Sequence, residues 1–319
     1  MTGSALRVSL GQASLAGAHD VNQDFHGALL PKGHQLASKG IALAIADGIS
    51  SSAVSQLASQ TAVGSFLEDY YATSEAWSVR RAAERVLSAT NSWLHSQTMG
   101  GDGRFEKDRG FVCTFCALIL KGRDLHLLHV GDSRIYRLHP HALEQLTEDH
   151  RVRMSSTESY LGRALGVGPH VEIDYRGWAA EVGEVYLLAT DGAYDWLSAE
   201  DVHRALLPDS RNLDGVAAHL VSLARSRGSE DDATLQLLRI DALPAGDATW
   251  LPGRVQLPEA AVHHEGAKRG PEQGVLGCER KAAAQPEPLI RMQQPGDDED
   301  HHRRDHQGRL RPAMLHAEV

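Results

Sequence analysis

Aspartates stand at the ends of apolar segments in several parts of this 319-residue chain. In "LAIADGISSSAVS" an apolar run ends on Asp47, and in "VYLLATDGAYD" another ends on Asp191. Each aspartate is followed by glycine. A lone aspartate at such a place more often caps a turn or a helix than takes part in catalysis. A functional interpretation therefore needs further carboxylates of the same kind.

Three more segments supply them. Asp24 lies in "VNQDF" between two expected strands, and Asp132 lies in "LLHVGDSRIYRL" at the turn of an expected hairpin. Asp231 and Asp232 immediately precede the last apolar run, in "GSEDDATLQLLRI". If these strand ends converge, the carboxylates repel one another unless cations lie between them. Oxygen ligands suit Mg²⁺ or Mn²⁺, and the chemistry that such a cluster serves is two-metal hydrolysis.

The elements that position these residues are short strands and long helices in an irregular order. Helical spacing of apolar residues predicts two long helices between 52 and 98 and one over roughly 213–226. This order favours antiparallel sheets with helices packed outside over a doubly wound parallel sheet. The expected strands are 5–10, 41–47, 111–120, 124–130, 133–138, 184–190 and 233–240.

The blocks "NQD", "ADG", "GDSR", "ATDG" and "SEDDAT", in this order, resemble the type 2C, metal-dependent protein serine/threonine phosphatases. The resemblance covers about residues 8–240. The amino-acid sequences of the segments "GQASLAG", "NQDFHG" and "HVGDSRIYRL" are most similar to the phosphatase half of bacterial phosphatase–kinase fusion proteins. The sequence has no glycine-rich ATP loop, HRD or DFG motif of a kinase. The resemblance implies an α+β fold, a four-layer α-β-β-α sandwich of two antiparallel sheets flanked by helices.

The resemblance also implies roles for individual residues. It implies that Asp47 bridges two metal ions, that Asp191 and Asp231 complete the protein ligands of the first, and that the Gly48 carbonyl contacts the second. Asp24 supports the second ion, mainly through water.

Two further parts of the site follow from the same resemblance. Asp132 falls on the position that helps to hold a weaker third ion in bacterial relatives, and residues 154–166 correspond to a flap beside the site. The implied nucleophile is a water that two divalent cations share and deprotonate, attacking the phosphorus of phosphoserine or phosphothreonine in line.

Three positions depart from the family pattern. His19 stands where the family has a phosphate-binding arginine, so we expect weaker phosphate binding or a replacement donor such as Lys32 or Arg163. Gln23 replaces a glutamate that binds metal through water. Ile49 replaces a histidine proposed as general acid, which leaves water to protonate the leaving group. The nearby His129 is expected to be a packed core histidine.

Three functional hypotheses remain open on these residues. The first is an active Mg²⁺- or Mn²⁺-dependent phosphatase of phosphoproteins, with a cognate serine/threonine kinase as a further partner. The second is a catalytically weak phosphatase-like domain that binds phosphoproteins or regulates a partner, which the histidine at position 19 keeps open. The third is a hydrolase of another phosphate ester.

Charge and composition exclude other classes. A formal net charge of −10 argues against nucleic-acid binding. We find no secretory signal and no apolar run of ~18 residues, so we expect no membrane contact and a cytoplasmic protein. Residues 243–319 are expected to be a disordered tail after a phosphatase domain at 1–242, because 245–319 contain eleven Leu, Ile or Val and no Phe.

The cysteines offer no alternative chemistry. Cys113 and Cys116 have CxxC spacing, but they lie in the apolar run "FVCTFCALIL". Side chains three apart in a strand point to opposite faces, so we expect two buried structural cysteines rather than a redox or zinc pair.

Overall fold

The apolar segment before Asp47 forms a strand that is buried on both faces. In the computed structural model it is β3 (Ile41–Ala46), and its side chains alternate between two cores because the side-chain period of a strand is two residues. The small side chains lie toward the helices and the branched ones toward the opposite sheet; these are Ala42, Ala44 and Ala46, and Ile41, Leu43 and Ile45, respectively. The alternation in "IALAIA" therefore sets the layers of the fold.

The structure describes residues 6–19, 21–140, 142–153, 159–206, 212–245 and 290–291. Two five-stranded antiparallel sheets make up its centre, in the orders β1-β12-β11-β6-β7 and β10-β5-β4-β3-β2. The strands of the first sheet are β1 (Arg7–Leu15), β6 (Arg134–His139), β7 (Ala142–Gln145), β11 (Val185–Ala189) and β12 (Ala233–Ala242). Those of the second are β2 (Phe25–Leu29), β3, β4 (Phe115–Lys121), β5 (Asp124–Val130) and β10 (Asp174–Ala179).

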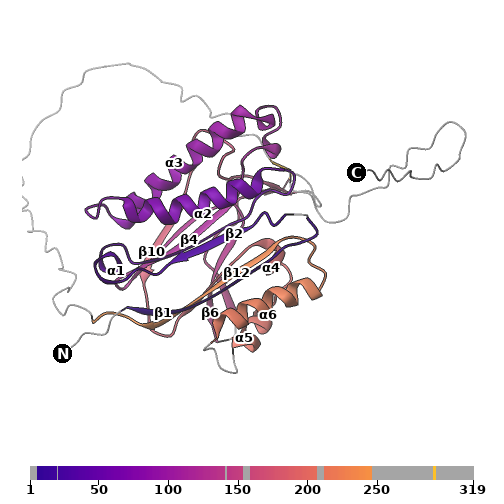
Figure 1. Cartoon of the computed structure of the whole chain (residues 1–319). Helices are drawn as coiled ribbons and strands as arrows, with labels where there is room; N and C mark the ends of the chain where they lie inside the picture. Colours follow the sequence, from indigo (N-terminus) through magenta and orange to yellow (C-terminus); the bar gives the residue numbers. More distant parts are fainter. Residues whose placement is uncertain are drawn as a thin grey trace, which may run out of the picture.

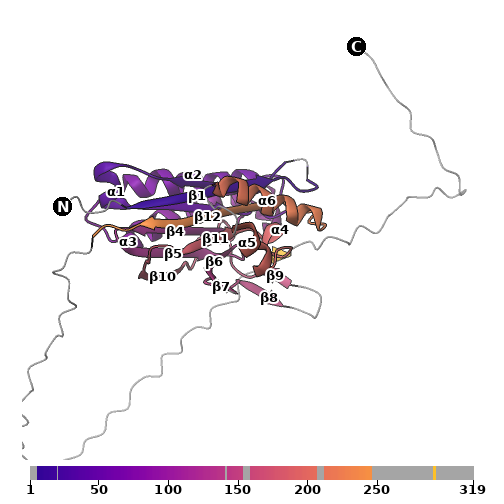
Figure 2. The same cartoon turned by 90° about the horizontal axis from the view of Figure 1, so that it is seen from below.

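Helices cover the outer face of each sheet (Figure 1). Figure 2 shows the same layers from below. The long pair α2 (Ser55–Ala72) and α3 (Val79–Gly100) packs on the second sheet, and α6 (Leu213–Ser226) packs on β1 and β12 of the first. Shorter elements are α1 (Gly33–Lys39), α4 (Asp191–Tyr194), α5 (Ala199–Leu206), η1 (Asp102–Arg104) and η2 (Lys107–Arg109). The expected four-layer α+β sandwich is confirmed.

The expected hairpin at Asp132 is wrong. β5 ends at Val130 in the second sheet and β6 begins at Arg134 in the first, so the chain passes between the sheets at this point. Gly131 has a φ of 108°, a conformation that L side chains rarely adopt, which permits the sharp change of direction. Asp132 therefore lies where the two sheets meet.

The strand expected at 111–120 begins later in the structure than the sequence predicts. β4 starts at Phe115, and Cys113 forms isolated bridges with Gly48 and Leu165 instead of extending the strand. Cys113 and Cys116 are both free and buried, and the Cys116 thiol lies 3.0 Å from the Ser133 carbonyl oxygen. The interpretation of structural cysteines is confirmed.

A small sheet borders the sandwich. It contains β8 (Arg151–Arg153), β9 (Ser159–Leu161) and β13 (Ile290–Arg291), in the order β13-β9-β8. Part of the expected flap, residues 154–158, lies outside the described residues. The expectation of a disordered tail also falls outside them, apart from 290–291, which pair with Leu161 and Tyr160 of β9.

Among the described helices, none combines the length and apolar character needed to cross a bilayer. α3, the longest of them, carries four charged side chains in its first two turns.

The division of the chain at 242 and 243 stays a prediction that truncation can test. The buried clusters of the two sheets end at Leu243, and Arg123 Nη1 donates to the Pro244 carbonyl at 2.8 Å. We expect a protein of residues 1–244 to keep its melting temperature within about 2 °C, because it keeps these contacts. Thermal unfolding by circular dichroism measures this, and a large loss of stability would show that the tail belongs to the fold.

Candidate metal centre

Six aspartates gather at one end of the sandwich. In antiparallel neighbours, the end of one strand and the start of the next share an edge, and the register places Ala46 opposite Phe25 and Ala189 opposite Leu235. The carboxylates that follow or precede these strands are thereby brought to the same edge. They are Asp24, Asp47, Asp132, Asp191, Asp231 and Asp232.

Asp47 is fixed by the neighbouring β4 segment. Its backbone N–H donates to Thr114 Oγ1 at 3.0 Å, and its carbonyl oxygen accepts from the Thr114 N–H at 2.8 Å. Gly48 follows in close contact with the start of α2, where an added Cβ would lie 2.8 Å from Ser55 backbone and side-chain atoms. Only glycine lets the chain turn here so near the helix.

The remaining carboxylates are held by backbone and hydroxyl groups. Asp24 Oδ2 accepts from Thr190 Oγ1 at 2.8 Å. Asp191 is the first residue of α4, and the Asp132 carbonyl oxygen accepts from the Tyr194 hydroxyl at 3.0 Å. Asp232 accepts the N–H groups of Gly17 and Gln23, both at 2.6 Å. Asp232 therefore fixes the connection between β1 and β2 and is a structural residue.

The arrangement is electrostatically costly without cations. Burial raises the pKa of Asp47 well above its usual value, and repulsion by Asp24 and Asp191 adds to this. Burial likewise raises the pKa of Asp132 and Asp191 to about 6, with further repulsion from Asp191 and Asp231, respectively. Each additional negative charge in this region makes ionisation of the others less favourable.

Unpartnered carboxylate oxygens show that these residues fit hard divalent cations. The Oδ1 atoms of Asp24, Asp132 and Asp191 are buried without a hydrogen-bond partner. A small cavity of about 20 Å³ is lined by Asp47, Gly48, Asp132, Asp191 and Asp231, among others. Asp132 and Asp191 thus have both an unpartnered oxygen and a place at this cavity, and carboxylate oxygens are the ligands that Mg²⁺ and Mn²⁺ prefer.

Sequence reasoning missed one basic residue at this centre. Arg151, the first residue of β8, donates from Nε to Asp132 Oδ2 at 2.6 Å and from Nη2 to Asp191 Oδ2 at 3.0 Å. The only sequence signal was its place shortly after "LTEDH", and no local pattern connects that segment to Asp191. Its contacts depend on how β8 lies across the end of the sandwich.

The three departures from the family pattern have defined surroundings. His19 is exposed, with a ring nitrogen within 4.8 Å of carboxylate oxygens of Asp231 and Asp232. The Gln23 side-chain amide donates to the Ser52 carbonyl oxygen at 3.1 Å. Ile49 is buried in a small apolar cluster with Val112, Leu161, Ala164 and Val167.

The two suggested replacement donors lie elsewhere. Lys32 caps α1, which connects β2 to β3 at the end of the sheet opposite to Asp47. Arg163 donates to Asp174 Oδ1 at 2.8 Å, and its Nη1 lies 3.0 Å from His150 Nε2. Neither side chain is placed at the carboxylate centre.

His129 is buried as expected, beside the Arg163 network. The centroid of its ring lies 4.6 Å from that of His150. Both ring nitrogens are buried without a hydrogen-bond partner. The Ser133 backbone acts to raise the pKa of the ring, against the larger effect of burial. Burial lowers the pKa of His129 to about 4. His129, His150 and Asp174 are spaced closely enough for a metal ion. However, the Arg163 guanidinium already supplies the positive charge beside Asp174, so this group is an ion-paired network.

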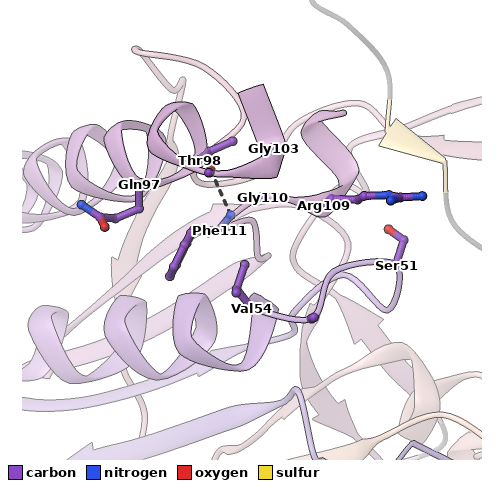
Figure 3. A pocket seen from close by; sticks show the side chains of 10 residues that line it. Ser51, Val54, Gln97, Thr98, Gly103, Arg109, Gly110 and Phe111 are labelled. Atoms are coloured by element: carbon purple, nitrogen blue, oxygen red, sulfur yellow. Dashed lines mark hydrogen bonds between the residues drawn. The ribbon is translucent and has the colours of Figure 1, made fainter. Parts of the chain in front are cut away.

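A second, larger cavity adjoins the centre. It has a volume of about 350 Å³ and lies between the residues before α2, the end of α3 and the segment 101–111. Figure 3 shows Arg109 and Ser51 at one side of it, and the hydrogen bond from the Phe111 N–H to Thr98 Oγ1 at 2.9 Å on the other. The chain from Gly48 to Val54 separates the two cavities.

A comparison with models of protein families shows the family of this chain. The model described as "Protein phosphatase 2C" matches residues 12–224, which is more than half of the chain. The chain belongs to the protein phosphatase 2C family. The family resemblance of the sequence blocks is thus confirmed, whereas the likeness to kinase fusion proteins stays a prediction.

Curated relatives include bacterial phosphatases of this family. The serine/threonine phosphatase stp of Listeria monocytogenes serotype 4b is 28% identical over 217 residues, which are 63% of this chain and 85% of that protein. The serine/threonine protein phosphatase PstP of Mycobacterium tuberculosis is 31% identical over 212 residues, covering 60% of this chain and 39% of that protein.

Solved structures of the family share the fold. The catalytic domain of PstP in complex with 2 manganese ions has a TM-score of 0.60 and 25% identity, over 75% of this chain and 100% of that one. The serine/threonine phosphatase of S. agalactiae has a TM-score of 0.64 at 22% identity, over 74% and 100%. The latter likeness shows the fold alone.

The raised pKa of Asp191 predicts how the metal-free protein responds to pH. Because the folded-state pKa of about 6 lies above the ordinary value of 3.8, the cost of ionising Asp191 in the folded protein builds up between about pH 4 and pH 6 and is complete above pH 6. In EDTA, Asp191→Asn should raise the free energy of unfolding by about 1–3 kcal/mol at pH 7.5. The gain should largely disappear at pH 4.5.

Denaturant unfolding at the two pH values measures this effect. The exposed Asp124 supplies the control, Asp124→Asn, which should change stability little at either pH. Added Mn²⁺ should reverse the order and stabilise the wild type more than Asp191→Asn. A gain that is equal at both pH values would contradict the electrostatic explanation.

Proposed function

We propose that this chain hydrolyses phosphoserine and phosphothreonine in proteins at a centre of two divalent cations, Mn²⁺ or Mg²⁺. The observation that carries the proposal is the convergence of Asp47, Asp132, Asp191 and Asp231 on one cavity with buried oxygens left unpartnered. The family membership and the two manganese ions of the PstP catalytic domain support it. When bound, the ions lower the pKa of a water that attacks phosphorus and neutralise the phosphoryl oxygens.

The protein's own residues would hold the two cations and keep their ligands in place. Asp47 would be shared by the two cations, Asp191 and Asp231 would help to hold one of them, and the Gly48 carbonyl and Asp24 would help to hold the other. The Thr114 bonds to the Asp47 backbone and the Thr190 bond to Asp24 keep these carboxylates in place. This preorganisation limits the rearrangement that ion binding and catalysis require.

Other residues determine how the phosphate is bound and protonated. His19 contacts the phosphoryl group beside Asp231 and binds it more weakly than an arginine would. Ile49 lies within an apolar cluster and offers no proton, so the leaving alkoxide takes its proton from water. The apolar wall around Ile49 limits access of bulk water to one side of the site.

The name of the PstP relative, a serine/threonine protein phosphatase, favours a protein substrate over a small phosphate ester. The neighbouring cavity of about 350 Å³ has room for a further side chain of such a substrate. The alternative of a catalytically weak phosphatase-like domain that binds phosphoproteins or regulates a partner is not favoured, because the carboxylates implied by the family are all present at the centre. A cognate kinase partner and a cytoplasmic location stay predictions of the sequence.

Removing the bridging carboxylate tests the proposed reaction. With Mn²⁺ and a phosphothreonine peptide, Asp47→Asn should lower kcat by roughly 10²-fold or more, because it removes a shared ligand of both ions. Release of inorganic phosphate measures the rate, and Asp124→Asn is the control. If the wild type shows no metal-dependent turnover, the proposed phosphatase activity is refuted. If it hydrolyses free nucleotides as fast as the phosphothreonine peptide, the proposed preference for protein substrates is refuted.

Restoring arginine at position 19 tests the role of that histidine. His19→Arg should lower KM for the phosphothreonine peptide by roughly tenfold, because a guanidinium binds phosphate through two charged hydrogen bonds. The matched control is His219→Arg, which changes an exposed residue of α6 in the same way. An unchanged or higher KM for His19→Arg alone would remove His19 from the phosphate site.

A further inference from the structure

Arg151 crosses the carboxylate centre between two aspartates from different sheets. It contacts one oxygen of Asp132, which leads into β6, and one oxygen of Asp191, which follows β11. The Asp132 side chain is 1% exposed and the Asp191 side chain 11%, so the guanidinium neutralises charge inside the protein. The second oxygen of each carboxylate, Oδ1, has no hydrogen-bond partner.

The backbone around Arg151 holds its side chain at this place. His150 Nδ1 accepts from the Gly131 N–H at 2.9 Å, and the His150 N–H donates to the Gly131 carbonyl oxygen at 2.8 Å. On the other side, Arg151 pairs with Leu161 of β9, and the Gly162 N–H donates to the His150 carbonyl oxygen at 2.6 Å. These bonds connect the start of β8 directly to the crossover that carries Asp132.

The charge of Arg151 is permanent. An arginine guanidinium stays protonated in proteins, and here it contacts two carboxylates directly. A guanidinium cannot leave this site as an exchangeable ion does, and its fork of donors matches two carboxylate oxygens at once.

Resting on the two-metal function proposed above, we propose that Arg151 is a tethered cation in the place of a third metal ion. The site includes Asp132, the residue at which the family resemblance implies a weaker third ion, and Arg151 joins it to Asp191. Arg151 takes one oxygen of each carboxylate, and the remaining Asp191 oxygen still serves the cation that it shares with Asp231. The carboxylate centre therefore accepts two ions, and the place between Asp132 and Asp191 is filled independently of metal concentration.

Counting bound Mn²⁺ tests this inference without measuring activity. Equilibrium dialysis with Mn²⁺ analysis, supported by the free-Mn²⁺ EPR signal, should show the wild type saturating at two ions, with no third ion at higher Mn²⁺. Arg151→Gln should gain a third, weaker ion, because two buried carboxylates lose their cation. Adding Asp132→Asn to Arg151→Gln should remove that third ion again.

A matched arginine supplies the control. Arg137 of β6 also lies between two carboxylates, Glu144 and Glu184, and its side chain is 29% exposed against 27% for Arg151. Arg137→Gln should bind two ions as the wild type does. Arg151→Lys, which keeps a positive charge in the same place, should also exclude the third ion.

The counts separate failure of this inference from failure of the proposed function. Three ions on the wild type would overturn the inference even if Arg151→Gln failed to fold, and so would a folded Arg151→Gln that gains none. Two ions on the wild type without phosphopeptide turnover would refute the phosphatase activity and leave the role of Arg151 intact. No bound ion on either protein would refute both.

Discussion

Mutual repulsion among buried carboxylates is the constraint on which the end of this sandwich depends. Asp47 lies among Asp24, Asp132, Asp191 and Asp231, and burial together with their charges raises its pKa far above the ordinary value. A fold that keeps such a cluster needs rigid support on all sides and cations to balance it. The support consists of strand ends, threonine hydroxyls and a glycine packed against α2. The metal chemistry follows from the same arrangement.

The two sheets contribute to the centre because the chain changes sheets beside it. The connection from β5 to β6 carries Asp132, and the connection from β1 to β2 leads to Asp24. Hydrogen bonds from Gly17 and Gln23 to Asp232 hold the latter connection against the start of β12. Neither sheet alone presents the full set of oxygens, so the site forms only when the sandwich is assembled.

Arg151 changes how the charge at this centre is balanced. A side chain from the small bordering sheet contributes one positive charge between Asp132 and Asp191, independently of any ion. The arginine missing from position 19 and the arginine present at position 151 are thus separate changes. The first concerns the proposed contact with the substrate phosphate, and the second concerns the proposed number of cations at the carboxylates.

The sequence by itself determined the strands of the centre, the long helices and the aspartates that end the strands. The alternation of "IALAIA" and the Asp-Gly pairs are local signals, and β3, β5, β6, β11 and β12 lie within two residues of their expected positions. Short edge elements such as β7–β10 lack a long periodic pattern and went unpredicted. The tertiary structure alone decided that Asp132 lies between sheets and that Arg151 reaches Asp191, 40 residues away. Strand periodicity reports which face is buried, but it does not say which sheet a strand joins or which distant charge it meets.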